Sequence, residues 1–223
     1  MEKSFLTSEE VREVLNNLKI MYPEASCELV HRTPFQLLAA VMLSAQTTDK
    51  RVNQVTEELF PKYPDAAAMS KADPAELQRI LKPIGMYKTK TDKLLKLSRM
   101  LMEEYNGVVP EDQQLLEKLP GIGRKSANVV MADAFGHQRI AVDTHVFRVT
   151  NRIGLVSEKD VLSTEKSLMK VLPEDQWTAC HHRLIWHGRR ICSARSPKCG
   201  NCGLSAVCLK KGVGTDRGKT EKE

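Results

Sequence analysis

The chain has 223 residues, 41% of them hydrophobic and 28% charged, which is the composition of a globular protein with a sizeable core. Its longest apolar run, residues 37–43, is far shorter than the roughly 18 residues of a membrane span, and residues 1–10 lack the apolar core of a secretory signal. We therefore expect a cytoplasmic protein with no membrane partner and with reduced cysteines. The 34 basic and 28 acidic residues leave a net charge of +6, which alone is weak evidence for a polyanionic partner.

Start signals and apolar spacing predict one helix after another. Thr7 and Glu10 form a capping box before the first helix, and Asp73-Pro74 opens another. The apolar run after Pro34 predicts a helix that is buried on nearly all sides. Further helical patterns cover residues 49–60, 90–105, 112–119, 124–135, 144–153, 164–172 and 174–190. Sustained alternation with a period of two is missing, so the sequence predicts an all-α fold, followed by a polar, disordered tail at 211–223.

Two tight glycine turns each connect a pair of predicted helices. The first is Ile84-Gly85-Met86-Tyr87 and the second is Pro120-Gly121-Ile122-Gly123. Glycines in the second turn let another surface approach the main chain closely, and the following helix start has unpaired N–H groups that suit a phosphate. Arg124 and Lys125 add positive charge there. A turn whose glycines only relieve strain is the alternative interpretation.

Lys125 and Asp143 are candidates for chemistry on a sugar. A lysine amine is a nucleophile only when it is neutral, and a helix start beside Arg124 disfavours its protonation. Asp143 precedes the predicted helix 144–153, where its carboxylate could accept a proton or stabilise developing positive charge. Taken singly, a solvated lysine and a helix cap are the plainer interpretations.

Four of the six cysteines are crowded near the C-terminus with the spacing C-x6-C-x2-C-x5-C. They are Cys192, Cys199, Cys202 and Cys208. Four thiols this close predict a metal site, and the spacing alone leaves structural zinc and an iron–sulfur cluster open. Cys27 and Cys180 fall outside the pattern and are expected in the core.

Basic residues gather beside these cysteines. Between residues 187 and 200 the chain carries Arg189, Arg190, Arg195 and Lys198 and no acidic residue. A basic loop held by a metal site would bind phosphates, so the placement of charge points to nucleic acid more strongly than the net charge does.

Five ordered motifs resemble the endonuclease III family of DNA glycosylases, and the resemblance covers the chain to about residue 210. They are Ser44-Ala45-Gln46-Thr47-Thr48-Asp49, Ile84-Gly85-Met86-Tyr87, Leu119-Pro120-Gly121-Ile122-Gly123-Arg124-Lys125, Val142-Asp143-Thr144-His145 and the 6-2-5 cysteine spacing. The resemblance implies two helical lobes. Residues 27–137 would form a six-helix lobe with the helix-hairpin-helix, and residues 1–26 with 138–210 a lobe with the iron–sulfur loop. The chain would cross near Gly136, which would place Lys125 and Asp143 on opposite walls of a DNA groove.

The same resemblance implies a bifunctional DNA glycosylase/AP lyase of base excision repair that acts on oxidised pyrimidines. Lys125 would form a Schiff base with the sugar and cut the strand by β-elimination, with Asp143 as the catalytic carboxylate. The family's cysteine spacing implies a structural 4Fe-4S cluster. We expect a monomeric bacterial enzyme associated with the nucleoid, whose partner is double-stranded DNA with damaged or abasic sites.

Residues that contact DNA are also implied by the resemblance. Gln46 would fill the gap left by the extruded base, and Met86, where the family usually has leucine, would act as an apolar wedge. Ser44 and Asp49 would face the extruded base. The expected phosphate contacts are Gly121, Gly123, Arg124, Arg190, Arg195 and Lys198.

Two alternative functions follow from the same residues. A base-only glycosylase, such as the adenine or T-mismatch relatives, would share the fold and the cluster but would not nick the strand. A non-catalytic DNA-binding module would bind duplex, release neither base nor nick, and be indifferent to Asp143→Asn.

Overall fold

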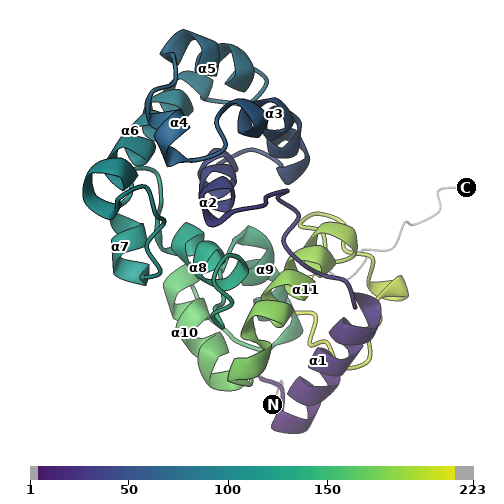
Figure 1. The fold of residues 1–223 in the computed structure, drawn as a ribbon. Coiled ribbons are helices and arrows are strands. Elements are labelled where there is room, and N and C mark those ends of the chain that lie inside the picture. The colour runs from purple at the N-terminus through teal and green to yellow at the C-terminus, as the bar shows by residue number, and fades with distance from the viewer. Residues whose placement is uncertain (1–4, 214–223) are drawn as a thin grey trace, which may run out of the picture. The chain divides into compact units, whose positions relative to one another are not determined.

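A computed structural model of the chain describes residues 5–213. Within this range the chain is helical and contains no strand, so the predicted all-α fold is confirmed. Figure 1 shows the helices, which are α1 (Ser8–Met21), α2 (Pro34–Leu43), α3 (Asp49–Lys62), α4 (Ala66–Ser70), α5 (Pro74–Leu81), α6 (Tyr87–Tyr105), α7 (Gln113–Lys118), α8 (Arg124–Asp133), α9 (Thr144–Ile153), α10 (Val161–Val171) and α11 (Trp177–Arg190), with short 3-10 turns η1 (Glu174–Gln176) and η2 (Cys199–Asn201).

Side-chain caps fix where several helices begin. The predicted capping box is present: Thr7 Oγ1 accepts from the Glu10 N–H at 3.3 Å, and Glu10 Oε2 accepts from the Thr7 N–H at 2.8 Å. Asp73 accepts from two N–H groups at the start of α5, and Asp143 does the same for α9. These caps satisfy amides that would otherwise lack partners, so local sequence sets the boundaries.

Contacts between residues divide the chain into two compact units. One unit is Cys27–Ala141, called the hairpin unit below. The other, called the cysteine unit, consists of the described parts of Met1–Ser26 and Val142–Glu223. The division falls after Ala141, a few residues beyond the expected lobe end at His137.

The hairpin unit is built around α2, whose residues from Phe35 to Leu43 are all buried. Helix α8 packs against α2, and α4 and α5 pack against α6. The described unit has seven helices, one more than the expected six, because α4 (Ala66–Ser70) is an additional short helix. This helix was missed since its alanine run has no apolar periodicity; Asp65 caps it by accepting from the Ala68 N–H at 2.8 Å.

In the cysteine unit, α1 and α9 both pack against α11 (Figure 1). The contact with α9 is close at Gly188, where an added Cβ would lie 2.9 Å from His145 Cβ. After the last cysteine, the Lys211 N–H donates to the Arg152 carbonyl at 3.0 Å. The first residue of the predicted disordered tail, Lys211, is therefore bonded to α9. The part of the tail from residue 214 lies outside the described range. Among the described helices, none is long and apolar enough to cross a membrane.

Candidate active site and cysteine loop

The second glycine turn joins α7 to α8 and exposes main-chain N–H groups. Gly121 has a φ of +85°, and a Cβ there would lie 2.9 Å from Cγ of the buried Met42. Gly123 is the N-cap of α8, and nothing lies within 4 Å of a Cβ built on it. Since Gly123 supplies no capping side chain, the first amides of α8 are suited to an anion. Arg124, at 3.9 Å from Glu117, adds an exposed cation to this helix start.

Lys125 is exposed in the first turn of α8. Its charge reaches the thiol of Cys27, which packs partly buried against the core of the same unit. Burial, with smaller contributions from the carboxylates of Asp133 and Asp49, raises the pKa of Cys27 to about 12, and the charge of Lys125 opposes this rise. The hairpin unit therefore brings Lys125 and Asp49 within electrostatic reach of one thiol.

Gln46 and Met86, the two residues expected to enter the DNA, both have left-handed backbone conformations. Their φ angles are +54° and +56°, values that cost a non-glycine residue free energy. Met86 is 51% exposed, although its neighbour Ile84 is buried and anchors the turn. An exposed apolar side chain at a tight turn is of the kind that can insert between bases.

Ser44 and Asp49 flank Gln46 in one short segment between α2 and α3. Ser44 is the C-cap of α2, and its hydroxyl donates to the Val41 carbonyl at 2.8 Å. Asp49 is the first residue of α3, after the capping residue Thr48, and is partly buried. The structure therefore gathers three of the expected site residues within the segment 44–49.

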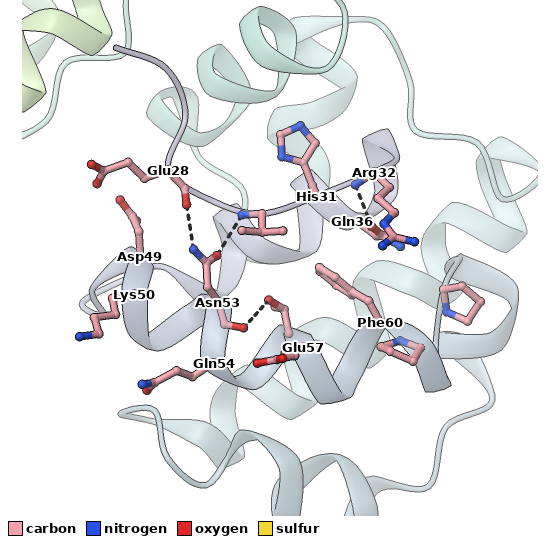
Figure 2. Close-up of a pocket in the computed structure, with 14 residues that line it drawn as sticks. Glu28, His31, Arg32, Gln36, Asp49, Lys50, Asn53, Gln54, Glu57 and Phe60 are labelled. Atoms are coloured by element: carbon pink, nitrogen blue, oxygen red, sulfur yellow. Dashed lines mark hydrogen bonds between the residues drawn. The ribbon is translucent and has the colours of Figure 1, made fainter. Parts of the chain in front are cut away.

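A groove of about 1120 Å³ lies between the segment 28–32 and α3 (Figure 2). Asn53 shapes it, because its amide donates to the Glu28 carbonyl at 2.8 Å and accepts from the Val30 N–H at 2.9 Å. Sequence reasoning did not predict this groove. Asp49 is the one expected site residue that lines it. Its lining mixes acidic and basic side chains, so it presents no field of one sign.

Asp143 is both the N-cap of α9 and a free acceptor at one oxygen. Its Oδ1 accepts from the N–H groups of His145 and Val146, each at 2.8 Å. The residue is partly buried, and the two capping bonds hold its carboxylate in one orientation. Asp143 is therefore a helix cap, as the plainer interpretation of the sequence predicted. The cap uses Oδ1 and leaves Oδ2 able to accept a hydrogen bond or a proton. Asp143 belongs to the cysteine unit, whereas Lys125 belongs to the hairpin unit.

The four clustered cysteines follow α11 and are all partly buried, free thiols. Burial raises the pKa of Cys202 and of Cys208, and negative charge on the other clustered thiols raises both further. The four sulfurs thus repel one another as thiolates and need a positively charged group. Sulfurs on one zinc ion lie close together, since each Zn–S bond is about 2.3 Å. In the described residues, no group of three or more His, Cys, Asp or Glu is arranged to hold a metal ion.

Hydrogen-bond donors point at the sulfurs of this loop. The Leu204 N–H donates to Cys202 Sγ at 3.4 Å, and the Lys210 N–H donates to Cys208 Sγ at 3.3 Å. His187 Nε2 lies 3.6 Å from Cys202 Sγ, and the Tyr22 hydroxyl lies 3.1 Å from Nδ1 of the same ring. Burial lowers the pKa of His187 to about 4, so the neutral ring carries one N–H. In the tautomer whose Nδ1 accepts from the Tyr22 hydroxyl, that N–H lies on Nε2 and points to Cys202 Sγ.

The basic residues of the loop are exposed, but the side chain of one of them, Arg190, is held in place by an aromatic ring. Arg190 lies over the Trp186 ring, with its guanidinium carbon 3.8 Å from the ring centre. This stacking fixes its direction and leaves the edge of the guanidinium for other partners. Arg195 and Lys198 are exposed beside the cysteines. All three belong to the cysteine unit.

Two residues that support these segments were missed by sequence reasoning. Arg152 of α9 donates to the carbonyls of Ser193 and Ala194 at 2.7 and 2.8 Å, which ties the cysteine loop to α9. Lys90 of α6 donates to Thr47 Oγ1 at 2.7 Å. Neither lies in a motif that indicates its partner, because each bond joins residues about 40 positions apart.

Comparison with known proteins identifies the family and the fold. Residues 39–174 match the family model of the HhH-GPD superfamily base excision DNA repair proteins. Endonuclease III of Bacillus subtilis is 48% identical over 91% of this chain and 93% of its own length. The Escherichia coli K12 enzyme is 46% identical over 89% and 94%. A solved structure of a trapped covalent intermediate between endonuclease III and DNA superposes with a TM-score of 0.87 at 48% identity, covering 92% of this chain and 96% of the other.

Proposed function

Because the chain belongs to the HhH-GPD superfamily and, within it, to the endonuclease III family, we propose that it is a bifunctional DNA glycosylase/AP lyase of base excision repair. Its substrates would be oxidised pyrimidines in duplex DNA. The observation that carries this proposal is Lys125, an exposed amine in the first turn of α8, directly after the open Gly123 turn. A nucleophile at a phosphate-binding helix start is placed to meet a sugar of the bound strand.

Binding would begin at phosphates. Main-chain N–H groups at Gly123 and Arg124 would hold one phosphate, and Gly121, whose φ is +85°, would let the chain turn tightly before them. Arg195 and Lys198 would contact the backbone electrostatically, while Arg190 is already oriented by Trp186. One copy of the chain carries all these groups, so we expect a monomer on double-stranded DNA with a damaged or abasic site.

Extrusion of the damaged nucleotide would follow, at a cost of a few kcal/mol. Met86 would unstack the base step, and Gln46 would occupy the gap, where its amide can both donate to and accept from the unpaired base. Ser44 and Asp49, which flank Gln46, would contact the extruded base.

Base removal would use Lys125 and Asp143 in different roles. The neutral Nζ of Lys125 attacks C1′ of the sugar while the C1′–N bond breaks, and the base leaves with the bonding electrons and takes up a proton. Oδ2 of Asp143 would stabilise positive charge on the sugar and accept the proton lost from Nζ. The sugar ring then opens: the C1′–O4′ bond breaks, O4′ takes up a proton, and the iminium between Nζ and C1′ that results acidifies the C2′ hydrogen. Its loss expels the 3′ phosphate by β-elimination, and water later releases the lysine.

The four clustered cysteines would hold a 4Fe-4S cluster. The convergence of four sulfurs and the N–H donors around them support this assignment. When bound, the cluster would supply positive charge and a rigid cross-link for the loop that carries Arg195 and Lys198. None of the bond changes above is a redox reaction at the base. Visible iron–sulfur absorbance of the anaerobically purified protein, with iron and sulfide by chemical analysis, would test it against zinc.

Borohydride trapping tests the proposed chemistry. The protein is incubated with a duplex that contains one thymine glycol, with and without borohydride, and the products are separated on a denaturing gel. We expect a nicked strand without borohydride and a covalent protein–DNA adduct with it, and Lys125→Gln should lose both. Base release without nicking would indicate a base-only glycosylase. Binding without release or nicking would indicate a non-catalytic module, and an adduct formed by Lys125→Gln would place the nucleophile elsewhere.

A further inference from the structure

Lys90 is a buried cation in the hairpin unit that the proposed chemistry does not use. Its residue is 3% exposed, and desolvation by burial lowers its pKa. Burying a charged amine costs free energy unless a specific contact compensates for it. The side chain makes one such contact within the described residues, a 2.7 Å hydrogen bond from Nζ to Thr47 Oγ1. A lysine kept in this position at such a cost indicates a role beyond packing.

This hydrogen bond joins the two segments that carry the residues expected to enter DNA. Thr47 directly follows Gln46, and the Lys90 N–H donates to the Met86 carbonyl at 2.9 Å, so Lys90 lies one helical turn after Met86. A second bond runs between the same segments, from Arg51 Nε to the Pro83 carbonyl at 2.9 Å. Two separate bonds therefore connect the segment 44–51 to the segment 83–90.

We propose that Lys90 is a positioning residue that fixes the Gln46 loop (residues 44–49) against the Met86 turn (residues 84–87), so that both side chains enter the duplex together. This inference rests on the function proposed above. It assigns Lys90 no contact with substrate; the residue acts through Thr47.

Backbone strain explains why such a link is needed. Gln46 and Met86 each hold a left-handed conformation that costs free energy and persists only when the surroundings impose it. Thr47 Oγ1 also donates to the Ala45 carbonyl at 3.4 Å, so the threonine that accepts the Lys90 hydrogen bond is itself bonded across Gln46. A loop released from Lys90 would relax separately from the turn. Errors of about 1 Å in placement can reduce a rate about a hundredfold.

The test compares Lys90→Met and Thr47→Val with a control, Lys96→Met, which removes an exposed lysine of the same helix paired with Asp92 at 3.0 Å. Methionine keeps the apolar stem of Lys90 and removes the buried charge, so the melting temperature should not fall. Single-turnover excision of thymine glycol is measured on a matched duplex and on a duplex whose flanking pairs are mismatched. Mismatches lower the cost of extrusion.

We expect Lys90→Met and Thr47→Val to lose about ten- to a hundredfold in excision on the matched duplex and to recover most of it on the loosened one. Thr47→Ser keeps the acceptor oxygen and should behave as wild type, as should Lys96→Met. Equal loss on both duplexes, or a lowered melting temperature for Lys90→Met, would show a merely structural lysine and overturn the inference.

Gln46→Ala and Met86→Ala, measured in the same assay, separate this inference from the proposed function. If both reduce matched-duplex excision and Lys90→Met does not, the positioning role is wrong and the function stands. If neither reduces it, the DNA-inserting roles themselves are wrong.

Discussion

Arg152 Nη1 donates a 2.7 Å hydrogen bond to the carbonyl oxygen of Ser193, so the last turn of α9 holds the residue that follows the first clustered cysteine. The same nitrogen lies 3.6 Å from Cys192 Sγ, and Nη2 donates to the Ala194 carbonyl at 2.8 Å. One guanidinium thus fixes three successive residues of the loop, and its planar, forked geometry is what makes this possible.

Replacing Arg152 by methionine should therefore loosen the cysteine loop, because the bonds that it removes hold that loop against α9. Carbonyls of Ser193 and Ala194 would lose charged donors, each of which contributes about 1.5–3 kcal/mol. We expect iron–sulfur absorbance to decay faster under a chelator and the melting temperature to fall. Arg12→Met, which removes an exposed arginine from α1 of the same unit, is the control. Unchanged decay in Arg152→Met would mean that the cysteines alone hold the loop.

Alanine should lower the stability of the fold at one glycine of the α7–α8 turn and leave it unchanged at the other. Gly121→Ala forces a side chain into a φ of +85° and against Met42 at 2.9 Å, so it should destabilise the fold by about 1–3 kcal/mol. Gly123→Ala meets nothing within 4 Å and needs no unusual φ, so the melting temperature should stay close to that of wild type.

Affinity for DNA completes this comparison. A methyl group at residue 123 would stand where a phosphate approaches the first amides of α8, so Gly123→Ala should bind duplex more weakly although it is folded. Fluorescence anisotropy of a labelled duplex at fixed salt, together with thermal unfolding, measures both effects. If Gly123→Ala bound duplex with wild-type affinity, the proposal that a phosphate binds at this turn would be wrong.

Local chemistry explains what the sequence could predict. N-caps act on amides two or three residues away, so Thr7, Asp73 and Asp143 could be recognised as caps from their neighbours alone. The cysteine spacing and the glycine turns are equally local. All of these features lie where the motifs placed them in the chain.

Tertiary contacts explain what the sequence could not predict. Nothing in the chain near Lys90 identifies Thr47 as its partner, and nothing near Arg152 identifies Ser193. The left-handed conformation of Gln46 has no sequence signal either, because that signal is normally a glycine or asparagine. Helix α4 and the groove beside Asn53 likewise depend on packing that no short motif records.

Cys27 should be unreactive towards alkylating agents although it is only partly buried. Its pKa is raised to about 12, so at neutral pH the thiolate fraction is on the order of 10⁻⁵, and the thiolate is the reactive form. Alkylation by iodoacetamide should therefore rise about tenfold per pH unit from pH 7 to pH 10. Peptide mass spectrometry of the native protein measures this, with the urea-unfolded protein as the control. Rapid labelling of native Cys27 at pH 7 would contradict the expectation.

Asp143 gives the sharpest separation of structure from chemistry, because one carboxylate oxygen caps α9 and the other is open. Asparagine is as good an N-cap as aspartate, so Asp143→Asn should keep the melting temperature while it removes the negative charge. We expect single-turnover base excision to fall by about 10²–10⁴-fold, the usual contribution of a positioned acid or base. Asp143→Ala should lose the cap as well, at about 0.5–2 kcal/mol of stability.

A preformed abasic site tests whether this loss belongs to base removal. The sugar then presents its aldehyde, so Lys125 can form the Schiff base without expelling a base, and borohydride trapping by Asp143→Asn should fall less than excision does. Equal losses in trapping and excision would mean that the carboxylate serves proton transfer at Lys125 in both reactions. Wild-type excision by Asp143→Asn would reduce this residue to a helix cap, because the charge would then have no part in the reaction.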